Sequence, residues 1–232
     1  EMPNNISQEN QIRISPQTIK ISGHQTRGYF LDHNKINNMK KSTQTTINGI
    51  GSDLTGEQKQ FFVNLYETIG YAESCYPVGN RVFSIEKQVG VKNGAYGFIQ
   101  VETYTAIDVI SQAIDAQRSN NPKVSMSYKN LDANCRQIFG MNLQGIKSYI
   151  QSKPAESLNN DNISMLVLFL KFRNRGFKDI QNFYDTNTMK NYTQNDYVSI
   201  WKNVWNTSKG GGTIPGGIQK NNEMRKLING SK

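Results

Sequence analysis

The chain has 232 residues, of which 36% are hydrophobic and 10% aromatic, and this is enough apolar material for one sizeable core. Its net charge is +9, from 27 Lys and Arg against 18 Asp and Glu, which favours an anionic polymer or surface as partner. The chain contains no run of about 18 apolar residues, so no transmembrane segment is predicted. It also lacks an arginine-lined helix, finger spacing and an RNA-binding aromatic motif, so no nucleic-acid partner is expected.

Cysteine and histidine each occur only twice, as Cys75, Cys135, His24 and His33. Two cysteines without a neighbouring histidine cannot form a zinc site, so no metal is predicted, and no cofactor is expected. A disulfide between the two cysteines would suit an oxidising compartment. Two free thiols in separate helices fit the sequence equally well.

The predicted organisation is one all-helical domain, residues 51–207, with polar extensions at both ends. The fold class is therefore all-α, with room for a small β-hairpin. Residues 1–50 contain only short apolar groups and too little apolar surface to fold alone, so they are expected either to dock on the domain or to stay mobile. Residues 208–232 comprise a Gly-rich linker and a short basic tail with a helical pattern.

The first helix of this domain is expected to begin at a capping box formed by Thr55 and Gln58. An apolar stripe continues from there to Ala72 at helical spacing, and Glu73 follows Ile69 by four residues, on the same side. Partial burial raises the pKa of a carboxyl group, so that it keeps its proton near neutral pH, as a general acid must. The alternative is a Glu at a helix end that turns to solvent or caps a neighbouring backbone group.

A polar loop follows, with a candidate strand at Val82–Ile85, and it leads into the Gly-rich turn Gly94–Gln100. Two glycines in this turn remove side chains that would keep the backbone away from a ligand. The sequence therefore pairs one carboxyl group with a turn suited to close approach.

The rest of the domain is predicted to be helical, apart from a polar loop over Ser119–Lys129. The most hydrophobic helix starts at Asp161 or Asn162, should be the central buried one, and ends near Asn174, whose amide is placed to face a cleft. The other expected helices are Thr103–Ala116, Leu131–Ile138, Asn142–Ile150 and Asp196–Trp205.

The order of these motifs resembles that of the lytic transglycosylases of the lysozyme superfamily. That family carries Glu-Ser at a helix end, as in Glu73-Ser74, and then a Gly-Ala-x-Gly-Leu-Met-Gln-Ile turn, which Gly94–Val101 resembles. Its third signature is similar to Asn142–Ile150, and its fourth is matched at Asn174 and Gly176.

The resemblance implies a lysozyme-like helical domain that cleaves the bond between N-acetylmuramic acid and N-acetylglucosamine in peptidoglycan. Glu73 would protonate the glycosidic oxygen and then act as base on the C6 hydroxyl of muramic acid, giving a 1,6-anhydro product. The acetamide of the substrate would stabilise the cationic intermediate, so a second carboxylate is not required.

The resemblance also implies roles for the neighbouring residues. Ser74 would orient Glu73 or bind substrate. Gln100 and Asn174 would hydrogen-bond sugar groups, and Tyr96 and Phe98 would wall the cleft.

Two alternatives remain open on the sequence. One is a goose-type lysozyme that hydrolyses the same bond, with Glu102 holding the water. The other is an inactive wall-binding or structural component of a phage or secretion apparatus. Because peptidoglycan lies outside the cytoplasm, the expected location is the periplasm, the cell surface, the extracellular space or a phage particle. The expected partner is a peptidoglycan strand, and a larger cell-envelope, secretion or phage assembly is a further candidate.

Overall fold

The computed structural model describes residues 11–13, 20–21, 24–25, 30–74, 94–174, 192–207 and 212–229. Over these ranges the mainly α fold expected from the sequence is confirmed, with a small β-hairpin. The helices are α1 (His33–Ile50), α2 (Gly56–Ser74), α3 (Thr103–Ala116), α4 (Pro122–Phe139), α5 (Leu143–Ser152), α6 (Pro154–Leu158), α7 (Asp161–Asn174), α10 (Gln194–Ile200), the π-helix η3 (Trp201–Trp205) and α11 (Ile214–Asn229).

The strands are short and pair antiparallel in twos. β1 (Gln11–Arg13) pairs with β4 (Phe30–Asp32), β2 (Lys20–Ile21) with β3 (His24–Gln25), and β5 (Ala95–Tyr96) with β6 (Val101–Glu102). In the part of the chain that the structure describes, no helix combines the length and apolar character needed to cross a membrane.

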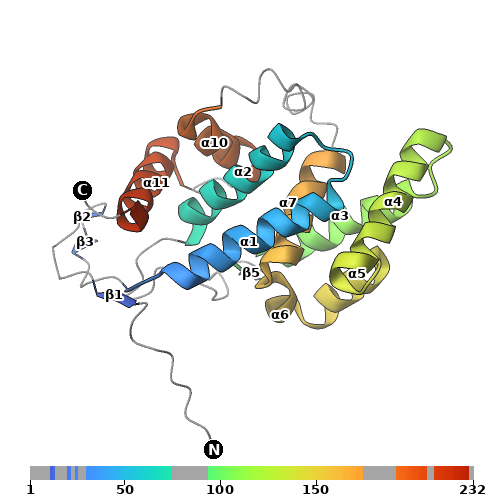
Figure 1. Cartoon of the computed structure of the whole chain (residues 1–232), viewed down its shortest axis with the longest axis horizontal. Helices are drawn as coiled ribbons and strands as arrows, with labels where there is room; N and C mark the ends of the chain where they lie inside the picture. The colour runs from blue at the N-terminus through green and yellow to red at the C-terminus, as the bar shows by residue number, and fades with distance from the viewer. Residues whose placement is uncertain are drawn as a thin grey trace, which may run out of the picture.

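Helix α7 is the central buried helix, as its sequence predicts. It is apolar on all sides, and this is typical of a helix surrounded by other elements. It contacts α1, α2, α3 and α6. In Figure 1, α10 and α11 lie beside α2 at one end of the molecule, whereas α4 and α5 lie at the other end. The buried residues of α7 are Ile163, Ser164, Met165, Leu166, Val167, Leu168, Phe169, Leu170 and Phe172.

Helix α2 begins at the predicted capping box. The backbone N–H of Gln58 donates to Thr55 Oγ1 at 3.2 Å, and the backbone N–H of Thr55 donates to Gln58 Oε1 at 2.9 Å. The two residues thus satisfy each other's backbone donors, which fixes the start of the helix. Helix α2 is 19 residues long, and its last two residues are Glu73 and Ser74.

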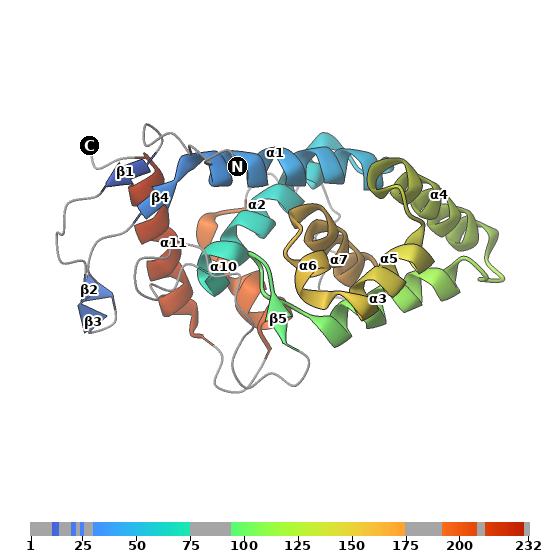
Figure 2. The same cartoon turned by 90° about the horizontal axis from the view of Figure 1, so that it is seen from below.

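Helix α1 belongs to the folded domain, and this corrects the predicted boundary at residue 51. Of the two expectations for the N-terminal extension, docking holds for residues 33–50. The polar composition of α1 is misleading because two threonines complete its buried face: Thr43 Oγ1 donates to the Met39 carbonyl at 2.9 Å, and Thr46 Oγ1 to Asn162 Oδ1 at 3.0 Å. The helix packs on α2, α4 and α7 (Figure 2). Its buried residues are Ile36, Met39, Thr43, Thr46, Ile47 and Ile50.

Helix α11 corrects the opposite boundary, at residue 207. It packs against α2 and α10 and buries Met224 and Asn221. The Asn221 amide donates to the Gly217 carbonyl at 3.0 Å and to the Thr68 carbonyl of α2 at 3.3 Å. Residues 214–229 are therefore an integral helix of the domain.

Helix α4 starts earlier than its sequence pattern suggests, so the predicted loop is wrong over residues 122–129. Asn121 Oδ1 accepts a hydrogen bond from the backbone N–H of Lys123 at 3.0 Å, and Pro122 occupies the first helical position. Both are standard features of a helix start. They set the beginning of α4 despite the polar composition of this segment.

Cys135 in α4 is a free, buried thiol, and burial raises its pKa to about 12. It is therefore protonated and unreactive at neutral pH. Cys75 and the candidate strand at Val82–Ile85 lie outside the described residues.

Candidate active site

Glu73 lies in the last turn of α2 and is a half-buried residue. Trp201 of η3 donates its indole N–H to Glu73 Oε1 at 2.6 Å. Burial raises the pKa of Glu73, and the hydrogen bond from Trp201 lowers it in part, because it stabilises the charged form. The net effect is upward, so the carboxyl group keeps its proton to a higher pH than an exposed glutamate does. The desolvation expected from the sequence is confirmed.

Three charged side chains on three other elements also act on Glu73. The positive charges of Lys220 in α11 and Lys171 in α7 lower its pKa, whereas the negative charge of Glu102 in β6 raises it. Lys220 Nζ also donates to the Ala72 carbonyl at 2.9 Å, at the end of α2 where a positive charge is favourable.

The Gly-rich turn is bonded to the end of α2 through Ser74, the residue that follows Glu73 in the chain. The Ser74 hydroxyl donates to the carbonyls of Gly97, at 3.3 Å, and Phe98. Residues 97–100 connect β5 to β6, and φ is positive at Gly94, just before β5, and at Gly97 and Gln100, with values of 76°, 79° and 50°. Positive φ at Gln100 is uncommon for a residue with a side chain, and such strain gathers at functional sites.

Gly97 is required in this turn for a second reason. A Cβ atom at this position would overlap the carbonyl oxygen of Leu158, at the end of α6. The turn is thus packed on α6 as well as bonded to α2, and its backbone has little freedom to move.

Burial bears on two of the predicted site residues. Ser74 is 1% exposed and is bonded to the turn, so of its two expected roles the structure favours a positioning role over substrate binding. Phe98 is 7% exposed, and its ring packs against Tyr66 and Tyr71 with centroids 5.9 and 5.8 Å away. It belongs to the core because its ring points back under α2, where it covers Gly70.

Three other predicted site residues lie on the hairpin between β5 and β6. Tyr96, Gln100 and Glu102 are half-buried, and all three belong to the hairpin that Ser74 holds. The Gln100 amide donates to the Gly97 carbonyl at 2.8 Å, which fixes the plane of its side chain. Asn174 ends α7, and its side chain lies outside the described residues.

Sequence reasoning missed the residues that complete the site from the C-terminal half of the chain. The sequence did not single out Trp201, Trp205, Lys171 or Lys220. Trp205 donates its indole N–H to the Ile99 carbonyl at 3.0 Å, and the Lys171 ammonium lies 4.6 Å from the centre of its ring. The one available signal was that the only two tryptophans of the chain stand four residues apart.

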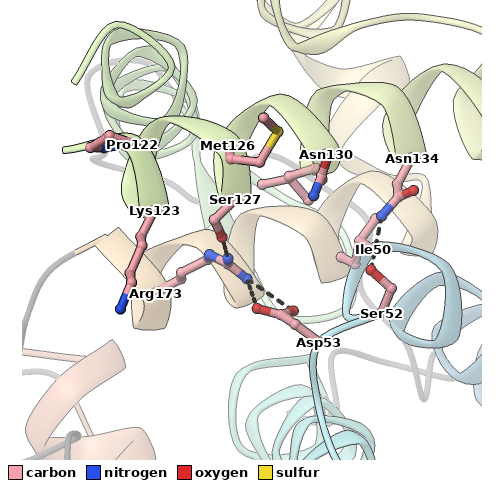
Figure 3. A pocket seen from close by; sticks show the side chains of 11 residues that line it. Ile50, Ser52, Asp53, Pro122, Lys123, Met126, Ser127, Asn130, Asn134 and Arg173 are labelled. Atoms are coloured by element: carbon pink, nitrogen blue, oxygen red, sulfur yellow. Dashed lines mark hydrogen bonds and ion pairs between the residues drawn. The ribbon is translucent and has the colours of Figure 1, made fainter. Parts of the chain in front are cut away.

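A pocket of about 480 Å³ lies elsewhere, at the beginning of α2 (Figure 3). Arg173 pairs with Asp53 at 3.1 Å and donates to Ser127, and Asn134 donates to Ser52 at 3.2 Å. These polar side chains bond one another and tie α4 and α7 to the turn before α2. Because α2 rises by about 1.5 Å per residue, Glu73 is roughly 25 Å away along the helix.

No cluster of three or more His, Cys, Asp or Glu side chains that could hold a metal ion occurs among the described residues. The fold and the site together define a mainly α-helical protein with one half-buried carboxyl group, bonded to an indole and set against a Gly-rich turn. Comparisons with models of protein families, with curated proteins and with solved structures find no match for this chain.

Proposed function

We propose that the chain is a peptidoglycan lytic transglycosylase, which cleaves the β-1,4 bond between N-acetylmuramic acid and N-acetylglucosamine and forms 1,6-anhydro-muramic acid. The observation that carries the proposal is the Glu73 carboxyl group, whose pKa is raised by burial while Trp201 holds one of its oxygens. The resemblance in the order of motifs supports the same assignment.

The hydrogen bond from Trp201 distinguishes the two oxygens of Glu73. An indole N–H only donates, so Oε1 acts as the acceptor and the proton of neutral Glu73 resides on Oε2. In the proposed reaction, Oε2 gives this proton to the glycosidic oxygen as the C1–O bond breaks. A positioned acid of this kind contributes a factor of about 10² to 10⁴ in rate.

Glu73 then acts as a base. Its carboxylate takes the proton of the C6 hydroxyl of muramic acid, and O6 forms the new bond to C1. The charged form needed at this step is stabilised by the indole of Trp201 and by the positive charges of Lys171 and Lys220. The proton returns to Glu73, so the acid is regenerated without a second carboxylate.

Gln100 and Asn174 are proposed to hydrogen-bond sugar groups, and Tyr96 to wall the cleft. The natural substrate lies outside the cytoplasm, so the protein is proposed to act in the periplasm, at the cell surface, or within a phage or secretion assembly. The net charge of +9 suits an anionic wall polymer.

The test is digestion of purified peptidoglycan, followed by mass spectrometry of the products. Wild-type protein should release muropeptides with anhydro ends, and Glu73→Gln should be slower by a factor of about 10² or more. Glu57→Gln, at the exposed first turn of α2, is the matched control and should retain activity. A Glu73→Gln variant that degrades the wall as fast as wild type would defeat the proposal.

A second candidate is a lysozyme that uses water, and it is favoured by the effect of Glu102 on Glu73. The charge of Glu102 raises the pKa of Glu73, as a second carboxylate near the reaction centre would. Glu102 could then hold a water that attacks C1. Reducing muramic ends that disappear in Glu102→Gln would establish hydrolysis, whereas anhydro ends that persist in this variant support the transglycosylase.

A further inference from the structure

The two tryptophans of η3 connect Glu73 to a second charged group. Trp201 contacts the carboxyl group of Glu73, and Trp205, four residues later, lies beneath the ammonium of Lys171 at 4.6 Å. Trp205 is itself fixed by its 3.0 Å hydrogen bond to the Ile99 carbonyl of the Gly-rich turn. The ammonium is therefore held on the face of a fixed indole, at the same site as the proposed acid.

Lys171 also stands on a rigid element. It belongs to α7, and its chain neighbours Leu170 and Phe172 are 0% and 2% exposed. A charged side chain whose backbone is anchored in the core is well suited to recognise a ligand with fixed geometry.

The positive charge of Lys171 works against the proposed acid. It lowers the pKa of Glu73 and so disfavours the protonated state that the first step requires. Among the residues that the structure describes, the other charges acting on Glu73 are Lys220 of α11, which acts in the same direction, and Glu102 of β6, which acts in the opposite one. An ammonium held on a fixed indole beside the proposed acid is also placed to pair with an anion on the substrate.

We propose that Lys171 is a specificity residue that binds the lactyl carboxylate of N-acetylmuramic acid and so selects peptidoglycan glycan over neutral chitin. This inference rests on the proposed function. Only the muramic sugar carries this carboxylate, since N-acetylglucosamine has a hydroxyl in its place. When the carboxylate pairs with Lys171, its negative charge offsets the ammonium, and the pKa of Glu73 rises in the complex.

Lys220 offers a matched control. Both lysines are half-buried and both act on Glu73, but Lys220 Nζ donates to the Ala72 carbonyl at the end of α2. Its role is therefore to hold α11 against α2, and its removal should lower stability without changing the preference between glycans.

The test compares the binding of two oligosaccharides of equal length in the Glu73→Gln background, which prevents cleavage. One alternates N-acetylglucosamine and N-acetylmuramic acid without peptides, and the other is a chitin oligomer. Lys171→Met should weaken binding of the muramic oligosaccharide about ten-fold or more, which is the scale of a lost charge-assisted hydrogen bond. Binding of chitin should change less than two-fold, Lys171→Arg should keep the preference, and Lys220→Met should keep it too.

The outcomes separate this inference from the proposed activity. Equal weakening of both oligosaccharides by Lys171→Met, or an unchanged preference, would overturn the role of Lys171. If wild-type protein yields no anhydro products but Lys171 still determines the preference in binding, the activity fails and the inference stands. If anhydro products form and the preference does not depend on Lys171, the proposed activity stands and the role of Lys171 fails.

Discussion

The indole nitrogen of Trp201 lies 2.6 Å from Glu73 Oε1, although 128 positions separate the two residues in the chain. The contact joins the end of α2 to the π-helix η3, and single π-turns of this kind are frequent at functional sites. Because an indole does not titrate near neutral pH, it donates to Glu73 in both protonation states. Trp201 therefore fixes the position of the carboxyl group throughout the proposed reaction.

Trp201→Phe should raise the pKa of Glu73 further. The substitution keeps an aromatic ring but removes the N–H that stabilises the charged form. The ¹³C NMR titration of the side-chain carboxyl carbon measures this directly, and the alkaline limb of the pH–rate profile should move to higher pH. Trp205→Phe is the control, since it loses a bond to Ile99 and leaves the carboxyl group untouched. If the titration midpoint of Glu73 in Trp201→Phe lay at or below that of wild type, the stabilising role of the indole N–H would be contradicted.

Glu73→Gln should make the protein more stable at neutral pH. The folded-state pKa of Glu73 lies above its ordinary value of 4.5, so the folded state binds more protons in that window, and stability falls as pH rises through it. Gln does not ionise, so the variant avoids this loss. Urea unfolding should show a gain over wild type at pH 7 that disappears below pH 4.5.

Glu156→Gln is a control that should change the stability of the protein in the opposite direction. The hydrogen bond from Tyr149 lowers the pKa of Glu156, so its ionised form contributes stability above its ordinary value and loses it as pH falls. This variant should be slightly less stable than wild type at pH 7. If Glu73→Gln, like Glu156→Gln, lowered the free energy of unfolding at pH 7, the desolvated state of Glu73 would be ruled out.

Gly97→Ala should destabilise the protein much more than Gly140→Ala. Both glycines have positive φ, of 79° and 67°, and Ala in this conformation costs about 1–2 kcal/mol. Nothing lies within 4 Å of a Cβ at Gly140, whereas a Cβ at Gly97 overlaps the Leu158 carbonyl. Forcing this contact adds about 1–3 kcal/mol. Denaturant unfolding of the two variants measures the difference, and equal losses would show that the turn can move away from α6.

The parts of the fold that were predicted correctly are those specified by neighbouring residues. The capping box of Thr55 and Gln58, the apolar faces of α3 and α7, and the turn at Gly94 are all encoded within a few positions. Helix α1 was missed as a core element because Thr43 and Thr46 read as polar, and their hydroxyl partners are visible only in the folded chain.

For the same reason, only the part of the site whose residues lie close together in the sequence was predicted. Glu73 and the turn lie close in sequence, and their association follows from the order of motifs. Periodicity cannot show that the indole N–H of Trp201 meets a carboxyl group 128 positions away in the chain. Phe98 was expected to wall the cleft because a motif does not reveal that a side chain points inward.

The position of η3 and α11 in the chain also sets the order in which the site is assembled during synthesis. The ribosome releases Glu73 and the Gly-rich turn well before Trp201 and Lys220, which follow α7 in the chain. A nascent chain that has emerged only as far as α7 carries the carboxyl group without its indole partner, and domains complete their packing only once their last elements are available. In the proposed function, the catalytic group would therefore lack its indole partner until η3 has been synthesised.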